Sequence, residues 1–396
     1  MRRVSPWSEI AWSLAGSAEL AALADRLAGG ARATRLPVAA AAWVADLLAE
    51  RSGRPLLVVV PHEGEARAWL ESLTLFSGAG AGLPFPAPSL SPYQAVDASL
   101  QVRAEEVVAL DRAASGATRA LVTTPRALFR RLPAPGRLAR IELARGDRLD
   151  AGELAVRLTA LGYRRVDLVA EVGDFAVRGG VFDLFAAGSE APLRLDLLGD
   201  ELESLRTFDP ESQRSQAELE RATLLPLALF PEGEEAAARL AELLAPLLEG
   251  EPGLESVELV RDLARGRRPA GWEHLLPLLE ARTATLAEAL ADPIVVALDP
   301  AALGAEIEHH AERLALEYQT RREHQRFALA PELLEHPAAT VAALVRGAHL
   351  TIDPLAGGAG AVDFGTTATD LFHGQLPRFP REVETARARG ERLVLV

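Results

Sequence analysis

Apolar runs followed by helical patterns recur in the first third of the chain. Residues 54–76 begin with a buried-strand pattern, LLVVV, and continue as an amphipathic helix, and residues 119–132 repeat this order. Such alternation predicts a parallel sheet covered by helices, and therefore an α/β fold. Between the two units, residues 82–100 are rich in proline and serine, which indicates an irregular loop before a helix over about 102–114.

In the middle of the chain, alternation of apolar and polar residues replaces the strand-then-helix pattern. Residues 150–163 predict a helix with Asp150 as its N-cap. In LRLDL, Leu193 and Leu195 point to one side while Arg194 points to the other. Turn residues such as GG and GD separate short strands, which we expect over 166–171, 174–178, 181–185, 193–198 and 201–208. The pattern predicts a small α+β domain with an antiparallel sheet, inserted into the α/β scaffold.

Helix and strand patterns return after the insert. Helices are expected over 234–250, 254–266 and 301–325, with a strand over 293–300. A third region opens near residue 348, and the chain ends in a helix followed by the apolar stretch RLVLV. Because domains usually end in exposed polar segments, we expect the chain to stop inside a domain. The alternative is a natural terminus that adds an edge strand.

Composition favours a soluble, multidomain protein. The chain has 396 residues, of which 49% are hydrophobic and 25% charged, enough to form more than one core. The absence of cysteine excludes disulfides and thiolate metal sites and suggests a reducing compartment. No signal peptide is evident, and the longest apolar run falls far short of the ~20 residues of a membrane-spanning helix. We therefore expect a cytoplasmic location.

Charge argues against a broad nucleic-acid surface. The formal net charge is −14, whereas binding to a phosphate backbone requires clustered positive charge. The chain also contains no lysine, so arginine and histidine supply every side-chain cation.

The missing lysine bears directly on nucleotide binding. Residues 27–48 have the outline of a glycine-containing loop entering a helix, in which Gly29 and Gly30 supply flexibility, Thr34 a hydroxyl, and Arg32 or Arg35 a cation. A P-loop requires a lysine at the β- and γ-phosphates, and the planar guanidinium of arginine does not replace that compact ammonium. We therefore interpret this segment as a degenerate nucleotide loop; that it never bound nucleotide is equally compatible with the residues.

A second test of ATPase chemistry also fails. Helicase-type ATPases place Asp-Glu after an apolar strand to hold magnesium and position water. Here Asp299 follows the strand VVAL, but Pro300 takes the place of the glutamate. We predict no catalytic residues, no cofactor and no hydrolysis in this chain.

Histidines at helical spacing raise the question of a metal site. Glu306, His309 and His310 lie three to four residues apart on the predicted helix, a spacing that can form a metal-binding face. No His-Glu-x-x-His pattern accompanies them, so a solvated, charged helix is the preferred interpretation, and no metal is expected.

Residues 162–215 resemble a known family. The elements that carry the resemblance are Gly162-Tyr163-Arg164, FAVRGG at 175–180, DLF at 183–185, RLD at 194–196, GDE at 199–201, Phe208-Asp209 and QRS at 213–215. They are similar to the inserted domain of the bacterial transcription-repair coupling factors (Mfd), and less closely to the repair helicase UvrB. The flanking segments agree more weakly.

The resemblance implies an organisation and a role. Residues 1–130 and 216–340 would form a split, degenerate RecA/UvrB-like domain, 131–215 the inserted UvrA-binding domain, and 341–396 a small, truncated α/β third domain. The segment that would carry UvrB's tyrosine-rich DNA-clasping hairpin contains only one tyrosine and one phenylalanine here. Recruitment of UvrA by mimicry of UvrB is therefore the implied function, with RNA polymerase and DNA bound only by regions outside this chain.

Arginines are the candidate contacts for UvrA. Residues 163–215 hold six arginines and eleven acidic residues, a net charge of −5, which suits pairing with a partner's carboxylates better than tracking phosphates. Strand alternation places Arg178 opposite an apolar face, and we expect Arg164, Arg165, Arg178 and Phe182 to contact UvrA. The alternative is that these arginines pair with Glu171, Asp174 or Asp183 inside the domain.

Two other functions stay open at this stage. One is a divergent UvrB-like, ATP-dependent DNA-repair helicase fragment, which magnesium-ATP binding would reveal. The other is a plain DNA-binding module, which salt-dependent DNA binding would reveal.

Overall fold

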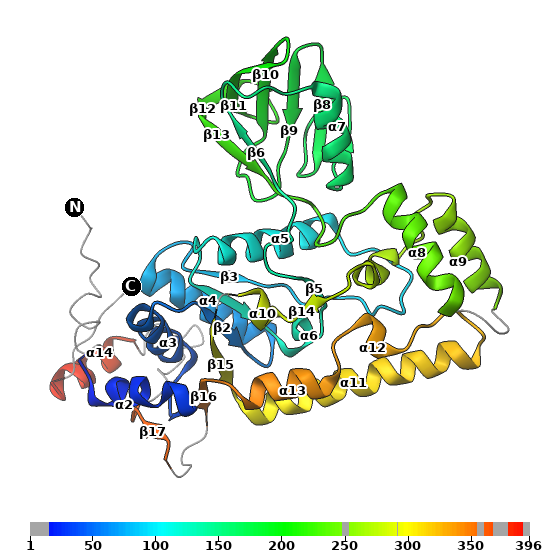
Figure 1. Ribbon diagram of the computed structural model, residues 1–396. Coiled ribbons are helices and arrows are strands. Elements are labelled where there is room, and N and C mark those ends of the chain that lie inside the picture. Colours follow the sequence, from blue (N-terminus) through cyan, green and yellow to red (C-terminus); the bar gives the residue numbers. More distant parts are fainter. Residues whose placement is uncertain (1–15, 248–252, 291, 355–359, 367–378, 391–396) are drawn as a thin grey trace.

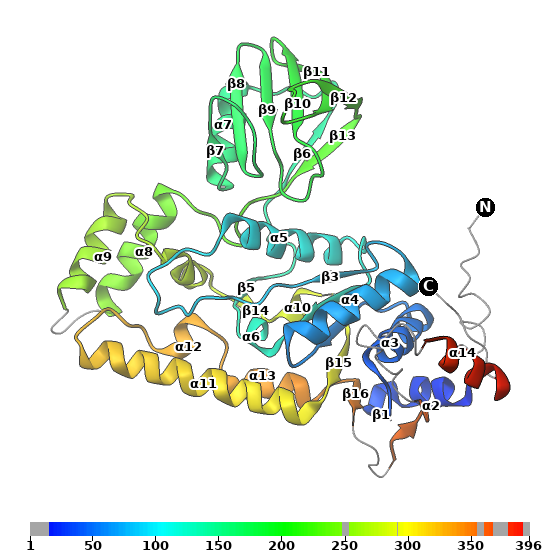
Figure 2. The ribbon, with the colours of Figure 1, turned by 180° about the vertical axis from the view of Figure 1, so that it is seen from behind.

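A computed structural model describes residues 16–247, 253–290, 292–354, 360–366 and 379–390. A scaffold built on a parallel sheet carries a smaller, mainly antiparallel domain, which stands on the side of helix α5 (Leu100–Ala114) in Figures 1 and 2. The predicted α/β class with a split parallel-sheet domain and an inserted α+β domain is confirmed. In the described part of the chain, every helix is too short or too polar to cross a membrane.

Seven parallel strands form the sheet of the scaffold, in the order β17-β1-β16-β15-β2-β4-β3. Their bounds are β1 (Ala31–Thr34), β2 (Leu56–Val59), β3 (Gly82–Pro84), β4 (Ala120–Thr123), β15 (Ile294–Leu298), β16 (Leu350–Asp353) and β17 (Val362–Asp363). Strand β2 is buried along its whole length. Parallel strands covered on both faces require such unbroken apolar runs, which is why LLVVV predicted this strand correctly.

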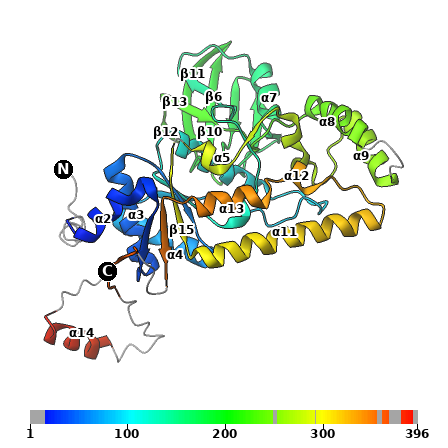
Figure 3. The same ribbon diagram turned by 60° about the horizontal axis from the view of Figure 1, so that its bottom comes forward.

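Helices cover both faces of this sheet. Leu56 and Val58 pack against α2 (Ala18–Arg26), α3 (Val38–Ser52) and α4 (Glu63–Ser77). Leu57 and Val59 point the opposite way, into a core that includes α5, α6 (Pro125–Leu128), α11 (Pro300–Glu323) and α13 (Ala338–Arg346). Figure 3 shows α11 and α13 running side by side.

The inserted domain contains a six-stranded sheet in the order β12-β11-β10-β9-β8-β7. Its strands are β7 (Arg164–Arg165), β8 (Asp174–Arg178), β9 (Val181–Leu184), β10 (Leu193–Leu198), β11 (Glu201–Phe208) and β12 (Ser215–Glu218), with helix α7 (Ala151–Ala160) beside them. The last four predicted strands are confirmed. The strand predicted over 166–171 is wrong, because Val169 turns inward onto Phe208 and Ala176 within an irregular segment.

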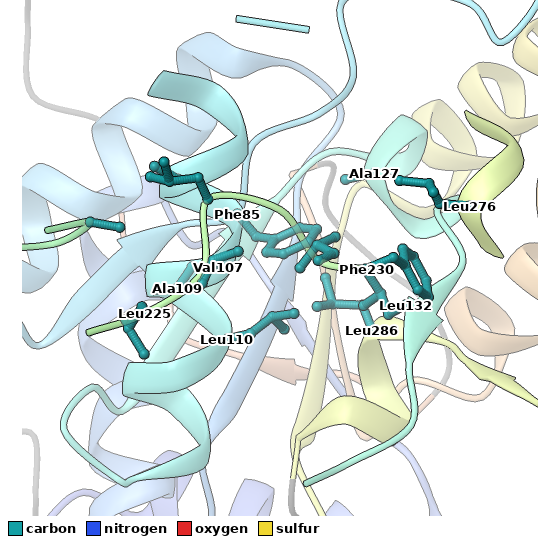
Figure 4. Close-up of a cluster of buried hydrophobic side chains, with 14 of the residues drawn as sticks. Phe85, Val107, Ala109, Leu110, Ala127, Leu132, Leu225, Phe230, Leu276 and Leu286 are labelled. Atoms are coloured by element: carbon teal, nitrogen blue, oxygen red, sulfur yellow. The ribbon is translucent and has the colours of Figure 1, made fainter. Parts of the chain in front are cut away.

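Both ends of the insert meet in one ladder and one core. Strand β6 (Ile141–Ala144) pairs with β13 (Arg221–Leu224), which brings the entry and exit of the small domain together. After β13, Leu225 and Phe230 pack beside Val107 and Leu110 of α5, as Figure 4 shows. The small domain is therefore joined to the scaffold by a shared hydrophobic core as well as by its two connections.

The second part of the scaffold begins with two helices. These are α8 (Glu234–Leu247) and α9 (Leu254–Ala264), followed by the 3₁₀ segment η2 (Trp272–Leu279) and α10 (Leu286–Ala289). Strand β14 (Thr283–Ala284) pairs with β5 (Leu132–Pro133). Backbone hydrogen bonds therefore join the scaffold segments before and after the insert.

The expected third domain requires a correction. Strand β16, which was assigned to a separate domain over 341–396, lies in the scaffold sheet between β1 and β15, and β17 pairs with β1. Beyond β17, the described residues contribute only helix α14 (Phe379–Ala388). The strand expected at RLVLV lies outside the described residues.

Candidate protein-interaction surface

The β8–β9 hairpin holds its two phenylalanines inside the small domain. Phe175 and Phe182 are 1% and 0% exposed, and their rings stack with centroids 5.6 Å apart. Between the strands, Gly179 adopts a φ of +60°, and a Cβ on Gly180 would lie 2.7 Å from the carbonyl oxygen of Leu197. The prediction that Phe182 contacts a partner is therefore wrong: its side chain belongs to the core.

Arg178 ends strand β8 on the surface. The residue is exposed to solvent, and its Nη2 donates a hydrogen bond to the backbone oxygen of Asp167. Alternation explains this position, because Phe175 and Val177 face the core while Arg178 faces the other side. The predicted exposure of this guanidinium is confirmed.

Arg164 has a partner within the domain. Its Nη2 lies 2.9 Å from Oδ1 of Asp174, whose carboxylate is only 6% exposed while the arginine side chain is 70% exposed. The hydrogen bond to this carboxylate raises the pKa of Arg164 above its ordinary value. Internal pairing, the alternative considered from the sequence, thus holds for Arg164.

Two further arginines are also paired across the sheet. Arg194 makes two hydrogen bonds to Asp183, of 2.7 and 2.8 Å, and lies over the ring of Phe208. Arg206 pairs with Asp196 on the next strand. These ion pairs neutralise most of the charge on this face of the sheet.

Arg165 lies on the edge strand β7 and is exposed. Within the described ranges its side chain has no hydrogen-bond or ion-pair partner. Arg165 and Arg178 are consequently the two predicted contact residues whose guanidinium groups form no ion pair inside the domain.

Two exposed leucines of the small domain were not predicted from the sequence. Leu168 is 51% exposed and follows Asp167, the residue whose carbonyl oxygen Arg178 binds. Leu198 is 70% exposed, and its neighbour Leu197 donates its backbone N–H to Gly180 of the adjacent turn. Leu198 precedes the turn GD at a strand end, which was the available signal, whereas the false strand over 166–171 concealed Leu168.

The degenerate nucleotide loop is placed differently from the prediction. Gly29 and Gly30 come before strand β1, and Arg32 and Thr34 are part of it. Only residues 35–37 connect β1 to helix α3, so the glycines do not form the entry to that helix. Pairing with β16 and β17, more than 300 residues later, makes residues 31–34 a strand.

Asp299 is the N-cap of helix α11. Its side chain accepts a hydrogen bond of 3.1 Å from the N–H of Ala302 at the start of α11, and its φ is +49°. Pro300 occupies the first turn of the helix, a position for which its fixed φ is suited.

The histidines of α11 do not form a metal site among the described residues. His310 is buried, and its Nε2 lies 2.7 Å from Oε2 of Glu335, while its ring packs on Phe129. His309 is exposed on the opposite side. The structure thus replaces the solvated-helix interpretation with a structural role for His310.

The single tyrosine of the proline-rich loop is also structural. The hydroxyl of Tyr93 donates a hydrogen bond of 2.7 Å to the backbone oxygen of Leu329, and the side chain is 7% exposed. Burial raises the pKa of Tyr93 well above its usual range. This ring is therefore not available to stack on a nucleic-acid base.

Comparison with known proteins identifies relatives of this chain and of its small domain. Residues 141–230 match the family described as the UvrB interaction domain. The chain is 30% identical over 247 residues to the transcription-repair-coupling factor of Escherichia coli K12, which covers 61% of this chain and 21% of that protein. Against the transcription-repair-coupling factor of Myxococcus xanthus it is 35% identical over 241 residues, or 56% of this chain and 20% of that protein.

The chain therefore spans about a fifth of the length of these curated relatives. The matched domain includes the β8–β9 hairpin. Residues 141–230 match the UvrB interaction domain family, and more than half of the chain is similar to transcription-repair-coupling factors.

Proposed function

We propose that this chain is a non-catalytic adaptor, corresponding to the N-terminal region of a transcription-repair coupling factor, that recruits UvrA by presenting a UvrB-like surface. The observation that carries the proposal is the exposed guanidinium of Arg178 on a domain of the UvrB interaction family. In this proposal the protein works in the cytoplasm, and contacts with RNA polymerase and DNA belong to regions of the relatives that this chain does not match.

The chemistry of the surface supports a protein partner. Arg165 and Arg178 form no ion pair in the described structure, so each can bind a carboxylate of a partner through two parallel hydrogen bonds. Leu168, which is half exposed beside Arg178, adds apolar area next to the charge. Arginine is among the residues that most often dominate binding energy in protein interfaces.

The scaffold supports the non-catalytic part of the proposal. No lysine is available to grip phosphates, and the connection from β1 to α3 is three residues long and includes Pro37, which has no backbone N–H to donate. Asp299 is committed to capping α11. We therefore infer that the scaffold serves as a frame for the small domain.

Size-exclusion chromatography with purified UvrA tests the proposal. The wild-type chain should co-elute with UvrA, and Arg178→Glu should elute separately, because charge reversal replaces an attraction with a repulsion. The matched control is Arg221→Glu: Arg221 is also exposed, but lies in the other sheet of the small domain, on β13, away from β8 in Figure 1. Co-elution of Arg178→Glu with UvrA, in a variant whose circular dichroism matches the wild type, would overturn the assignment.

A further inference from the structure

A pocket of about 450 Å³ lies beside strands β1 and β16, on the side of the scaffold sheet that α11 and α13 cover. Alternation along β1 places Ala31 and Ala33 in the core on the opposite side of the sheet, so Arg32 faces the pocket. Thr351 of β16 is in register with Arg32 and lines the same pocket. This edge of the sheet therefore presents polar side chains to the pocket, whereas β15 is buried along its whole length.

Two arginines line this pocket from different elements. Arg32 comes from β1, and Arg346 is the last residue of α13. Both are exposed, and neither forms a hydrogen bond or an ion pair with the residues that the structure describes. Among the described residues that line the pocket there is no Asp or Glu, although acidic residues outnumber basic ones by 56 to 42 in the chain. The pocket is therefore a place where positive charge is not neutralised.

The rest of the wall is apolar or lacks side chains. Ile307 of α11 and Val345 of α13 supply apolar surface. Gly29 and Gly304 also line the pocket, and a Cβ at either position would meet nothing within 4 Å. Gly304 lies inside helix α11, where alanine is the more stable residue. Packing within the described structure gives no reason for a glycine there, and its effect is to keep the pocket open.

We propose that this pocket is a docking site for an acidic segment of a partner protein, in which apolar residues stand beside the carboxylates. Each guanidinium can bind a carboxylate through two parallel hydrogen bonds, and the apolar wall buries the neighbouring apolar side chain. Charge complementarity of this kind selects partners at protein interfaces. A chain with a net charge of −14 repels acidic segments elsewhere, so the two arginines give this place its selectivity.

The same features disfavour other ligands. Small-molecule sites enclose most of the ligand surface, whereas both arginines here are exposed. The pocket reaches the amino ends of β1 and β16, where Gly29 and Ala348 line it, whereas nucleotides bind beyond the carboxyl ends of parallel strands. A nucleic-acid backbone requires a larger cluster of positive charge and gains nothing from an apolar wall.

Fluorescence anisotropy with a labelled probe peptide tests the proposal. The probe is a short peptide in which glutamate and leucine alternate, and its counterpart has serine in place of leucine. The wild-type chain should bind the leucine peptide about tenfold more tightly than the serine peptide, because only leucine uses the apolar wall. Arg346→Gln and Arg32→Gln should each weaken binding of the leucine peptide about tenfold. Gly304→Leu keeps both arginines but fills the pocket, and should abolish binding.

Matched controls separate the pocket from general effects of charge and size. Arg221→Gln removes an exposed arginine of the small domain, and Gly64→Leu enlarges a glycine of α4 that also faces open space. Neither should change peptide binding. Circular dichroism of every variant should match the wild type.

Several results would overturn the proposal. They are equal binding of the two peptides, unchanged binding by folded Gly304→Leu or Arg346→Gln, and displacement of the leucine peptide by oligothymidylate. Dimers of the chain in sedimentation velocity that Gly304→Leu abolishes would assign the pocket to a second copy and overturn it as well. The proposed capture of UvrA uses the small domain, so each of these results leaves that function unaffected.

Discussion

Arg178 and Phe182, four residues apart in one hairpin, have opposite environments. Arg178 is exposed at the end of β8, whereas Phe182 is fully buried against Phe175. The family resemblance suggested both as contacts, and strand alternation distinguishes them. At the scale of single residues, the proposed contact surface therefore consists of Arg165 and Arg178, while Phe182 supports it from inside.

Substitution of these two residues should affect different properties. Phe182→Ala leaves a cavity in the small-domain core and should lower the free energy of unfolding by about 3–5 kcal/mol. Arg178→Ala should change it by no more than about 0.5 kcal/mol, as is usual for surface positions. Urea denaturation followed by circular dichroism measures both. Equal stability of the two variants would contradict the assigned positions.

His274 should make stability depend on pH. Burial, together with the charge of Arg130, lowers its pKa to about 4, while an unfolded chain has a histidine pKa of about 6.5. Between these pH values the histidine of the unfolded chain is protonated, whereas His274 in the folded chain stays neutral. Stability is therefore lost as pH falls from about 6.5 to about 4 and is fully present above 6.5.

The loss attributable to His274 can be isolated by comparison with His274→Gln. Across that pH window, the stability of the wild type should fall by up to about 3 kcal/mol more than that of the variant. Thermal or urea unfolding at a series of pH values measures the difference. Parallel stability curves for the two proteins would show that the ring is not protected from protonation.

At the scale of elements, local patterns predicted those strands whose partners are neighbours in sequence. Strands β8 to β11 form consecutive antiparallel pairs, and alternation predicted all four. Strand β1 was missed because its sequence, ARAT, lacks the apolar run that marks β2, and its partners β16 and β17 lie more than 300 residues away. The degenerate loop expected at Gly29 to Thr34 was misplaced for this reason.

Contact between the small domain and helix α5 depends on glycine. Gly173 has a φ of +96°, and a Cβ there would lie 2.8 Å from Leu100 of α5 and 2.9 Å from Leu227. Gly179 has a φ of +60° but faces open space. Both positions therefore have a positive φ that disfavours other residues, and they differ clearly in packing.

Alanine at each of these glycines should separate packing from backbone strain. Gly179→Ala should cost about 1–2 kcal/mol through its backbone conformation alone. Gly173→Ala should cost about 1–3 kcal/mol more, because the added methyl group collides with two leucines. Urea denaturation gives both values. A Gly173→Ala variant as stable as Gly179→Ala would mean that the small domain does not press on α5 at this point.

At the scale of the whole molecule, a buried ion network fixes the return from the small domain to the scaffold. Glu232 follows that return and is 5% exposed; it pairs with Arg103 of α5 and lies 3.6 Å from Arg268. Arg103 also lies 3.6 Å from Glu273 of η2. Burial raises the pKa of Glu232, yet the two guanidinium groups beside it oppose that shift. Three segments separated in sequence are thus joined around one carboxylate.

Removal of that carboxylate should be costly. Glu232→Ala leaves Arg103 largely buried with only Glu273 as a partner, and should lower the free energy of unfolding by about 3–5 kcal/mol. Asp292→Ala breaks an exposed pair, in which the aspartate is 81% exposed, and should cost no more than about 1 kcal/mol. Comparable losses in urea denaturation would show that the buried network contributes no more to stability than an exposed ion pair does.

Domain assignment was the part of the whole-molecule picture that sequence reasoning handled least well. The insert was expected over 131–215, where its antiparallel pattern and its family motifs lie in one continuous stretch, but β12 and β13 extend the small domain to residue 224. The expectation of a third domain from residue 341 onward was wrong for β16, because this strand completes a sheet whose other strands begin near residue 31. Sheet membership of this kind is decided by long-range pairing and leaves no local mark.

The central claim is that this chain occupies the surface of UvrA that UvrB uses. A competition experiment tests it most directly: fluorescently labelled chain bound to UvrA is titrated with unlabelled UvrB, and the released fraction is followed by fluorescence anisotropy. The proposal predicts full displacement, with labelled Arg221→Glu displaced like the wild type and labelled Arg178→Glu never bound. A stable complex that contains UvrA, UvrB and this chain together would contradict it. Absence of binding between the wild-type chain and UvrA would contradict it as well.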